Sequence, residues 1–361
     1  MLDFFILFLI SVFIGFSLVF TFQKLFYKLD ILDNPEKYKL KRAPIPYSMG
    51  VVLFLGFFLV SFGLTLLGTL EYNFKLGLIW VFGFFITAIS FLDDRLDVSP
   101  KIRLIFQILI GTIIGITSIK IGYISNIFGG IIELETYFIE LFHFKIYTIP
   151  LIFTIIWYVF IFNALNWTDG IQGNTSGLSI ISFFILFLLG IILFHNDINI
   201  DGIKNNQFIM IISLILVGIL IPFWYYDFSG KILMGDSGTM FLGFMLATLA
   251  IIAGGKIATV GVVFGIYSVD AVYVLIRRLI NKKSPLSGDF THLHHRLLDL
   301  GLEKKHVLYL IYTLSFFFGM TALFLDKSGK IIVFGIIVIL VIFINKIVET
   351  GIKSHNRLRK K

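Results

Sequence analysis

A single carboxylate, Asp236, stands between two glycines at the start of a long apolar run. An ionisable side chain at the edge of an apolar run is costly to place near a bilayer, so such a residue is usually kept for function. The sequence predicts that Asp236 binds a divalent cation that holds a diphosphate, because carboxylates suit hard cations and a helix N-terminus attracts phosphate. A capping role at the helix start is the alternative, and the two roles are compatible.

Two adjacent carboxylates, Asp93 and Asp94, directly follow another apolar run. Adjacent carboxylates repel each other unless a cation neutralises them, so such a pair either binds Mg²⁺ or supplies a general base. The alternative is a hydrated loop in which Ser99 caps the next helix.

Amides, an acid and glycines gather in one short stretch further along the chain. Asn163 and Asn166 lie three residues apart and share a helix face, while Gly170 and Gly173 let the backbone turn closely past a ligand. A helix C-cap followed by a turn explains one Asn and one Gly, but not the whole set with Asp169. We therefore expect a binding loop here.

Three of the seven histidines lie close together as His292, His294 and His295. Imidazoles beside Arg296 suit a diphosphate or a leaving-group phosphate. A zinc site that uses His292 and His295 on one helix face is the alternative.

Two further charges stand out. Asp270 is a lone acid inside an apolar run, which indicates function, although Arg277 two turns away makes a structural tether an equal alternative. Two prolines that bracket Ile45 form a rigid turn that could hold Arg42 towards a phosphate, and an inside-positive stop signal is the other interpretation.

The composition places these residues in a membrane. Of 361 residues, 58% are hydrophobic and 14% are charged, as in all-α polytopic membrane proteins. The absence of Cys excludes disulfides and a Cys-based zinc site. The basic residues are scattered among loops, so we predict no nucleic-acid binding. A span needs roughly 20 apolar residues, which predicts about eleven transmembrane helices at 3–23, 48–70, 76–92, 101–119, 147–165, 175–194, 207–226, 236–254, 257–279, 306–325 and 329–347.

The distribution of positive charge predicts an orientation. With the N-terminus outside and the C-terminus cytoplasmic, only seven of the 30 Lys and Arg residues fall outside. All the polar clusters then face the cytoplasm, as an active site built between helices would require. We expect one integral-membrane domain over 1–361 with a cytoplasmic-face active site and a basic cytoplasmic tail at 348–361, and a short hairpin or interfacial helix in the outer segment 120–146.

In their order along residues 30–300, these motifs resemble the polyprenyl-phosphate N-acetylhexosamine-1-phosphate transferases, glycosyltransferase family 4. This superfamily also contains the phospho-N-acetylmuramoyl-pentapeptide transferases. Each motif alone is weak, but five in order are specific. They are Pro44-Ile45-Pro46, Asp93-Asp94 with Lys101 and Gln107, the Asn-x-x-Asn-x-x-Asp-Gly loop from Asn163, Met-Gly-Asp-Ser-Gly from Met234, and His-x-His-His from His292.

The resemblance implies a reaction at the cytoplasmic membrane. A sugar-1-phosphate, N-acetylhexosamine-1-phosphate in this branch, would move from a UDP-sugar to undecaprenyl or another polyprenyl phosphate. UMP would be released, and a cell-envelope polysaccharide begun. Mg²⁺ is the implied cofactor, with Mn²⁺ as the alternative, because two approaching anions must be neutralised. The implied partners are the UDP-sugar, the lipid acceptor and the bilayer, and a homodimer is left open.

The resemblance also implies roles for individual residues. Asp93 would deprotonate or orient the lipid phosphate, Asp94 would support it or the metal, and Asp236 would bind Mg²⁺ with Asn166. The implied substrate-binding residues are Arg42, Lys101, Asn163, Asn166, Asp169, His292, His294 and His295.

The chain departs from the family pattern in four places. Gln172 stands where members commonly have a second Asp, and the segment 226–233 lacks the usual Asn-x-Pro-Ala. A paired glycine after the proline turn is reduced to Gly50, and Ser268 stands where a Pro is common before Asp270. These departures concern the donor more than the chemistry. A phospho-N-acetylmuramoyl-pentapeptide transferase, or a lipid-binding or transport homologue without catalysis, are the alternative functions.

Overall fold

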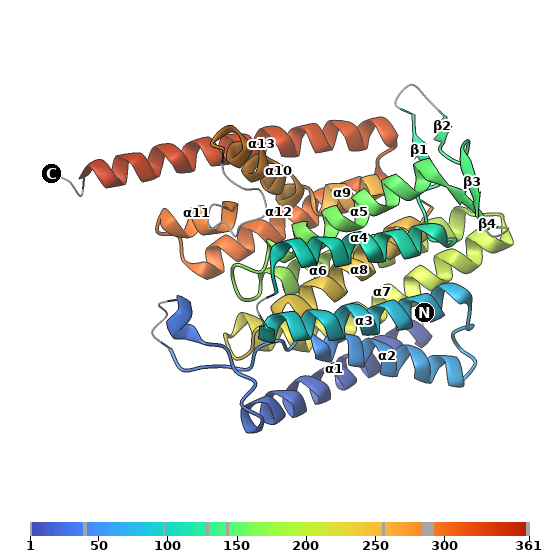
Figure 1. Cartoon of the computed structure of the whole chain (residues 1–361), viewed down its shortest axis with the longest axis horizontal. Coiled ribbons are helices and arrows are strands. Elements are labelled where there is room, and N and C mark those ends of the chain that lie inside the picture. The colour runs from blue at the N-terminus through green and yellow to red at the C-terminus, as the bar shows by residue number, and fades with distance from the viewer. Residues whose placement is uncertain are drawn as a thin grey trace.

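The computed structural model describes residues 2–38, 42–96, 98–126, 130–141, 144–254, 257–282 and 292–358, most of them in a bundle of helices (Figure 1). The helices are α1 (Leu2–Lys28), α2 (Val51–Leu66), α3 (Phe74–Leu96), α4 (Pro100–Ile116), α5 (Thr148–Asn166), α6 (Asn174–Asn196), α7 (Ile200–Phe228), α8 (Gly235–Ile252), α9 (Ile257–Val263), α10 (Gly265–Ile280), α11 (Leu293–Asp299), α12 (Lys304–Phe324) and α13 (Lys327–Leu358).

Each of the eleven expected segments contains a helix, and the expectation of an all-α polytopic membrane protein is confirmed. Within the described ranges, eight helices are long and apolar enough to cross a membrane, or nine if α9 and α10, which meet at 81°, form one broken span. The helices α2 and α4, with 16 and 17 residues, fall short in length. The total of eleven spans therefore stays a prediction.

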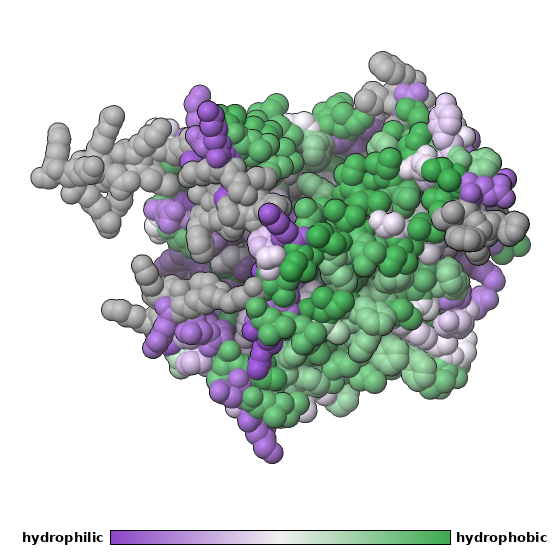
Figure 2. Space-filling view, viewed as in Figure 1, coloured by the Kyte–Doolittle hydropathy of each residue, from purple (hydrophilic) through white to green (hydrophobic). Residues whose placement is uncertain are grey.

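The centre of the bundle is formed by α7 and α8. In the apolar stretch of α8, 94% of the residues are buried, against 22% in the peripheral α1. The peripheral helices carry the exposed apolar side chains, which form the green band between more polar ends in Figure 2. Because lipid offers no hydrogen bonds, helices that satisfy their own backbone can present this surface to a bilayer.

The segment 120–146 forms two antiparallel hairpins, so the hairpin alternative is confirmed. In the first, β1 (Tyr123–Ser125) pairs with β2 (Ile131–Glu133), and in the second β3 (Phe138–Leu141) pairs with β4 (Phe144–Tyr147). The hairpins lie at one end of the molecule and α11 lies towards the other (Figure 1).

The two termini lie towards opposite ends of the molecule in Figure 1, as an odd number of crossings requires. The C-terminal helix α13 continues to Leu358 and so includes the predicted tail as far as that residue, while 359–361 lie outside the described residues. Which end faces the cytoplasm stays a prediction from the charge distribution.

Candidate active site

The start of α8 is held by the turn that contains the two prolines. Leu233 donates its backbone N–H to the Pro46 carbonyl at 2.8 Å, and Met49 donates to the Leu233 carbonyl at 3.0 Å. Gly235 follows with a φ of +72°, a left-handed conformation that glycine adopts without strain. This turn places Asp236 in the first turn of the helix.

Asp94 accepts hydrogen bonds from the first backbone N–H groups of α8. Its Oδ1 accepts from the Asp236 backbone N–H at 2.8 Å and from the Tyr47 hydroxyl at 2.9 Å, and its Oδ2 accepts from the Ser237 N–H at 3.2 Å. A carboxylate at a helix N-terminus is stabilised by the helix dipole and satisfies amides that lack intrahelical partners. Asp94 therefore fixes α3 to α8 and positions Asp236.

Arg103 joins the other two carboxylates of the site. Its Nε lies 2.9 Å from Asp93 Oδ2 and its Nη1 lies 2.5 Å from Asp236 Oδ2. The second oxygen of Asp93 accepts from the Val98 N–H at 2.9 Å. With its side chain 34% exposed, Arg103 can still reach an anionic ligand. The guanidinium is thus a fixed positive charge between two acids.

Sequence reasoning treated Arg103 only as one of the inner positive charges. Two signals could have identified it. A charge placed inside an expected membrane span is costly, and Arg103 lies four residues before Gln107, so both share the face of α4 that meets α3 and α5.

Asn166 at the end of α5 contacts Asp236 directly. Its Nδ2 donates to Asp236 Oδ1 at 2.7 Å and to Thr239 Oγ1 at 3.1 Å. Asn163, one turn earlier, donates instead to Gln107 Oε1 on α4 at 2.7 Å. The two amides therefore have different contacts. Asn166 belongs to the cluster of Asp93, Asp94 and Asp236, which we call the carboxylate cluster, and Asn163 joins α5 to α4.

The loop after α5 lies against the histidines of α11. A Cβ on Gly170 would collide with the Nε2 atoms of His294 and His295, so only glycine lets these rings approach the loop. The Trp167 ring stacks on the His292 imidazole, with 5.6 Å between centroids and 25° between planes. The structure therefore brings the predicted binding loop and the predicted histidine cluster together.

Burial controls the charge of two groups here. Burial and the nearby charge of Asp227 raise the pKa of Asp169 well above its usual range, despite a hydrogen bond from Thr175 Oγ1 at 3.1 Å. Burial and the two neighbouring histidines lower the pKa of His294 well below its usual range, so this imidazole is neutral at pH 7. Neither ring nitrogen of His294 has a hydrogen-bond partner among the described residues. Both ring nitrogens are buried and Nε2 faces Gly170, so this neutral imidazole packs against the binding loop.

Two of the predicted phosphate-binding residues lie apart from this cluster. Arg42 pairs with Asp33 through two hydrogen bonds of 3.1 and 2.6 Å, so its charge is already matched. Lys101 is exposed in the first turn of α4. Their roles in substrate binding stay predictions.

Two of the departures from the family pattern, Gln172 and the segment 226–233, are joined by Lys304. Lys304 Nζ on α12 donates to the Phe228 carbonyl at 3.0 Å and to Gln172 Oε1 at 3.4 Å. The buried Asp227 accepts from Ser176 Oγ at 2.6 Å. The changed residues thus form one patch beside the binding loop.

The carboxylate cluster suits a hard cation. Within the described ranges, no three His, Cys, Asp or Glu side chains converge as a metal site would need. Magnesium needs fewer protein ligands, because it keeps waters and binds substrate phosphates. The Arg103 guanidinium shows that a positive group is accommodated between Asp93 and Asp236. Asn166 points its Nδ2 at Asp236, and turning this amide over would present its oxygen there instead. The carboxylate oxygens suit a hard cation, and binding of Mg²⁺ by Asp236 and Asn166 stays a prediction.

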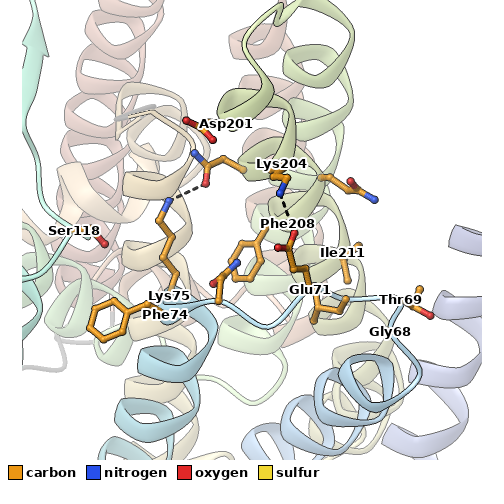
Figure 3. A pocket seen from close by; sticks show the side chains of 14 residues that line it. Gly68, Thr69, Glu71, Phe74, Lys75, Ser118, Asp201, Lys204, Phe208 and Ile211 are labelled. Atoms are coloured by element: carbon orange, nitrogen blue, oxygen red, sulfur yellow. Dashed lines mark hydrogen bonds and ion pairs between the residues drawn. The ribbon is translucent and has the colours of Figure 1, made fainter.

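A larger hollow of about 650 Å³ lies elsewhere, between the α2–α3 loop and the start of α7 (Figure 3). Its two lysines have partners within the hollow: Lys75 donates to Asn205 Oδ1 at 2.8 Å, and Lys204 pairs with Glu71 at 3.2 Å. None of the candidate residues lines it. Cavity volume alone therefore does not locate the chemistry.

Replacing Gly235 with Ala should disrupt the site. The new Cβ would lie 2.6 Å from Asp94 Oδ2, and the residue would have to keep a positive φ. We expect a loss of about 1–3 kcal/mol of stability, seen as a lower Tm in detergent. The matched control is Gly261→Ala on α9, where a Cβ meets no atom within 4 Å. An unchanged Tm for Gly235→Ala would contradict the geometry of this turn.

Comparison with known proteins agrees with the motifs. The model of the family described as Glycosyl transferase family 4 matches residues 76–254, which include the carboxylate cluster and the binding loop. The chain is 28% identical over 336 residues to the probable undecaprenyl-phosphate N-acetylglucosaminyl 1-phosphate transferase of Bacillus subtilis, covering 91% of this chain and 87% of that protein.

Two further relatives extend the comparison. The undecaprenyl-phosphate alpha-N-acetylglucosaminyl 1-phosphate transferase of Salmonella typhi is 28% identical over 318 residues, covering 84% of this chain and 79% of its own. A phospho-N-acetylmuramoyl-pentapeptide-transferase of Borreliella afzelii is 26% identical over 334 residues, covering 88% and 92%. Together with the ordered motifs, these matches support glycosyl transferase family 4, whose model covers just under half of the chain, while the relatives are similar over most of its length.

Proposed function

We propose that the protein transfers N-acetylglucosamine-1-phosphate from its UDP-activated form to a polyprenyl phosphate in the cytoplasmic membrane, with release of UMP. The observation that carries this proposal is the convergence of Asp93, Asp94 and Asp236 around Arg103 and Asn166 at one end of the bundle. The names of the relatives from Bacillus subtilis and Salmonella typhi support the sugar and the lipid.

A groove beside the carboxylates supports the lipid acceptor. This cavity of about 260 Å³ ends at Asp93, Arg103 and Gln107 and is otherwise mostly apolar. Ile89 and Ile102, which are exposed on the lateral surface, line its edge, so the groove opens towards the hydrocarbon. An isoprenoid chain in this groove would bring its phosphate to Arg103.

The reaction needs one bond made and one broken. An oxygen of the acceptor phosphate attacks the sugar-bearing phosphorus of the donor, and the bond from that phosphorus to UMP breaks. A phosphate monoester has a second pKa near 6, so the acceptor is mostly a dianion at pH 7 and no proton has to be removed. Asp93 therefore contributes by orienting Arg103, which draws the acceptor phosphate towards the donor.

The remaining residues hold the donor. Magnesium, when bound by Asp236 and Asn166, neutralises the charge of the diphosphate and makes the reacting phosphorus more electrophilic. The neutral His294 imidazole lies buried between the binding loop and His295, where it supports this side of the site without the desolvation cost of a buried charge. The loop at Gly170 closes this side of the site.

Asp169→Asn should separate stability from activity. Because burial raises the pKa of Asp169, its charged form costs folding free energy, and this cost grows as the pH rises above the pKa of the unfolded chain. Asn removes the cost and can still accept from Thr175. We expect a Tm equal to or above that of the wild type, with a difference that widens at higher pH, and a kcat lower by about 10-fold or more. A lower Tm at every pH would contradict this assignment.

A donor screen tests the function. Purified protein is incubated with Mg²⁺, undecaprenyl phosphate and radiolabelled UDP-N-acetylglucosamine, UDP-N-acetylgalactosamine or UDP-N-acetylmuramoyl-pentapeptide. We expect label in the lipid phase with UDP-N-acetylglucosamine. Lipid-linked label only from the pentapeptide donor would favour the muramoyl-pentapeptide alternative. Absence of lipid-linked label with every donor, in a folded sample, would refute the proposal.

A further inference from the structure

A buried acid lies directly behind the histidine cluster. Asp270 on α10 is 0% exposed, and its Oδ2 accepts from His292 Nδ1 at 3.0 Å and from the Leu293 backbone N–H at 3.0 Å. The sequence suggested Arg277 as a partner of Asp270, whereas the structure pairs Asp270 with His292. One carboxylate oxygen thus holds both the imidazole of His292 and the first residue of α11.

This contact determines how His292 can act. A carboxylate that accepts a hydrogen bond from Nδ1 requires the proton to be on Nδ1, so Nε2 carries the lone pair in the neutral ring. The His292 ring stacks on the Trp167 ring from the binding loop. The His294 ring lies nearly parallel to the His292 ring, with 6.1 Å between centroids. The ring therefore has a defined tautomer and a defined plane.

Resting on the function proposed above, we propose that Asp270 is a positioning residue for the transfer reaction. It fixes His292 in the Nδ1–H tautomer and anchors the start of α11, so that the Nε2 lone pair can accept a hydrogen bond from a hydroxyl group of the donor. A buried acid that only stabilised the fold would need hydrogen-bond donors of any kind. A donor on a histidine that packs against the binding loop connects Asp270 to the site instead.

Isosteric substitutions distinguish positioning of His292 from stabilisation of the fold. Asp270→Asn keeps an oxygen that can accept from the Leu293 N–H but loses the charge that fixes the tautomer. His292→Asn keeps a donor near the position of Nδ1, and hence the tether, but removes Nε2. Ser268→Ala, at a buried position on the same helix, is the matched control.

We expect Asp270→Asn to lower kcat by about 10- to 100-fold, the usual cost of removing a group that orients a functional histidine, with the donor KM changed less than about threefold. His292→Asn should keep the wild-type Tm and lose at least as much activity. Asp270→Ala added to His292→Asn should lower kcat no further, because both substitutions interrupt one chain of contacts. Ser268→Ala should match the wild type.

Wild-type kcat for either Asp270→Asn or His292→Asn would overturn the proposal, as would a full additional loss in the double variant. If Asp270→Asn does not fold, His292→Asn still decides the question. Absence of transfer by the wild type would refute the proposed function instead. In that case, additive effects of Asp270→Asn and His292→Ala on Tm would overturn the tether separately.

Discussion

Replacing Asp236 with Asn is expected to lower kcat by roughly 10³-fold or more, equivalent to about 4 kcal/mol of transition-state stabilisation. The Oδ2 atom of Asp236 pairs with Arg103 and its Oδ1 accepts from Asn166, so a neutral amide would keep at most one of these contacts and would lose the charge that a divalent cation needs. The start of α8 should survive, because Asp94 accepts from the backbone of this residue and not from its side chain. The measurement is a steady-state assay with thermal unfolding as a check on folding.

The matched control is Asp201→Asn, an exposed acid at the opposite end of α7, which should leave kcat unchanged. Activity of Asp236→Asn within about tenfold of the wild type, in a folded sample, would show that the carboxylate neither binds the cation nor positions Arg103.

Arg103→Met should produce the second largest effect. The substitution removes the only positive group that the structure shows between Asp93 and Asp236 in the described part of the chain, and leaves two acids facing each other. We expect kcat/KM for the lipid acceptor to fall by about 10²- to 10³-fold, with a smaller loss for Arg103→Lys, because an ammonium cannot bridge two carboxylates as a planar guanidinium does. The measurement varies the acceptor concentration at saturating donor.

Arg95→Met is the matched control, since Arg95 is exposed in the last turn of α3 near the same end. Equal losses for the two arginines would mean that general positive charge, and not the bridge, explains the effect. An unchanged acceptor kcat/KM for Arg103→Met would remove Arg103 from the mechanism.

Much of this architecture follows from the sequence. The apolar runs predicted the position of every long helix. In lipid there is no water to bond the backbone N–H and C=O groups, and a helix forms these hydrogen bonds within itself. The motifs around Asp93, Asn166, Asp236 and His292 were expected to share one end, since each lies at the boundary of an apolar run, and the structure joins them there.

The pairings within the site could not be predicted, because side-chain partners depend on how helices rotate and cross. The Arg42–Asp33 ion pair was not expected, and a role of Arg42 in phosphate binding stays a prediction. Arg103 is not part of any of the sequence motifs. It reaches Asp93 and Asp236 only because α4 packs beside α3 and α8. Asp270 has several cations within reach along the sequence, and only the bend of 81° between α9 and α10 and the placement of α11 select His292.

The most direct test of the proposed reaction follows the phosphorus atom. Wild-type protein is given undecaprenyl phosphate and UDP-N-acetylglucosamine labelled with ³²P in the phosphate next to the sugar. Transfer of the sugar-1-phosphate predicts that the ³²P enters the lipid phase while unlabelled UMP is released in equal amount. Recovery of the ³²P in water-soluble UDP, with the sugar alone on the lipid, would contradict the proposed reaction.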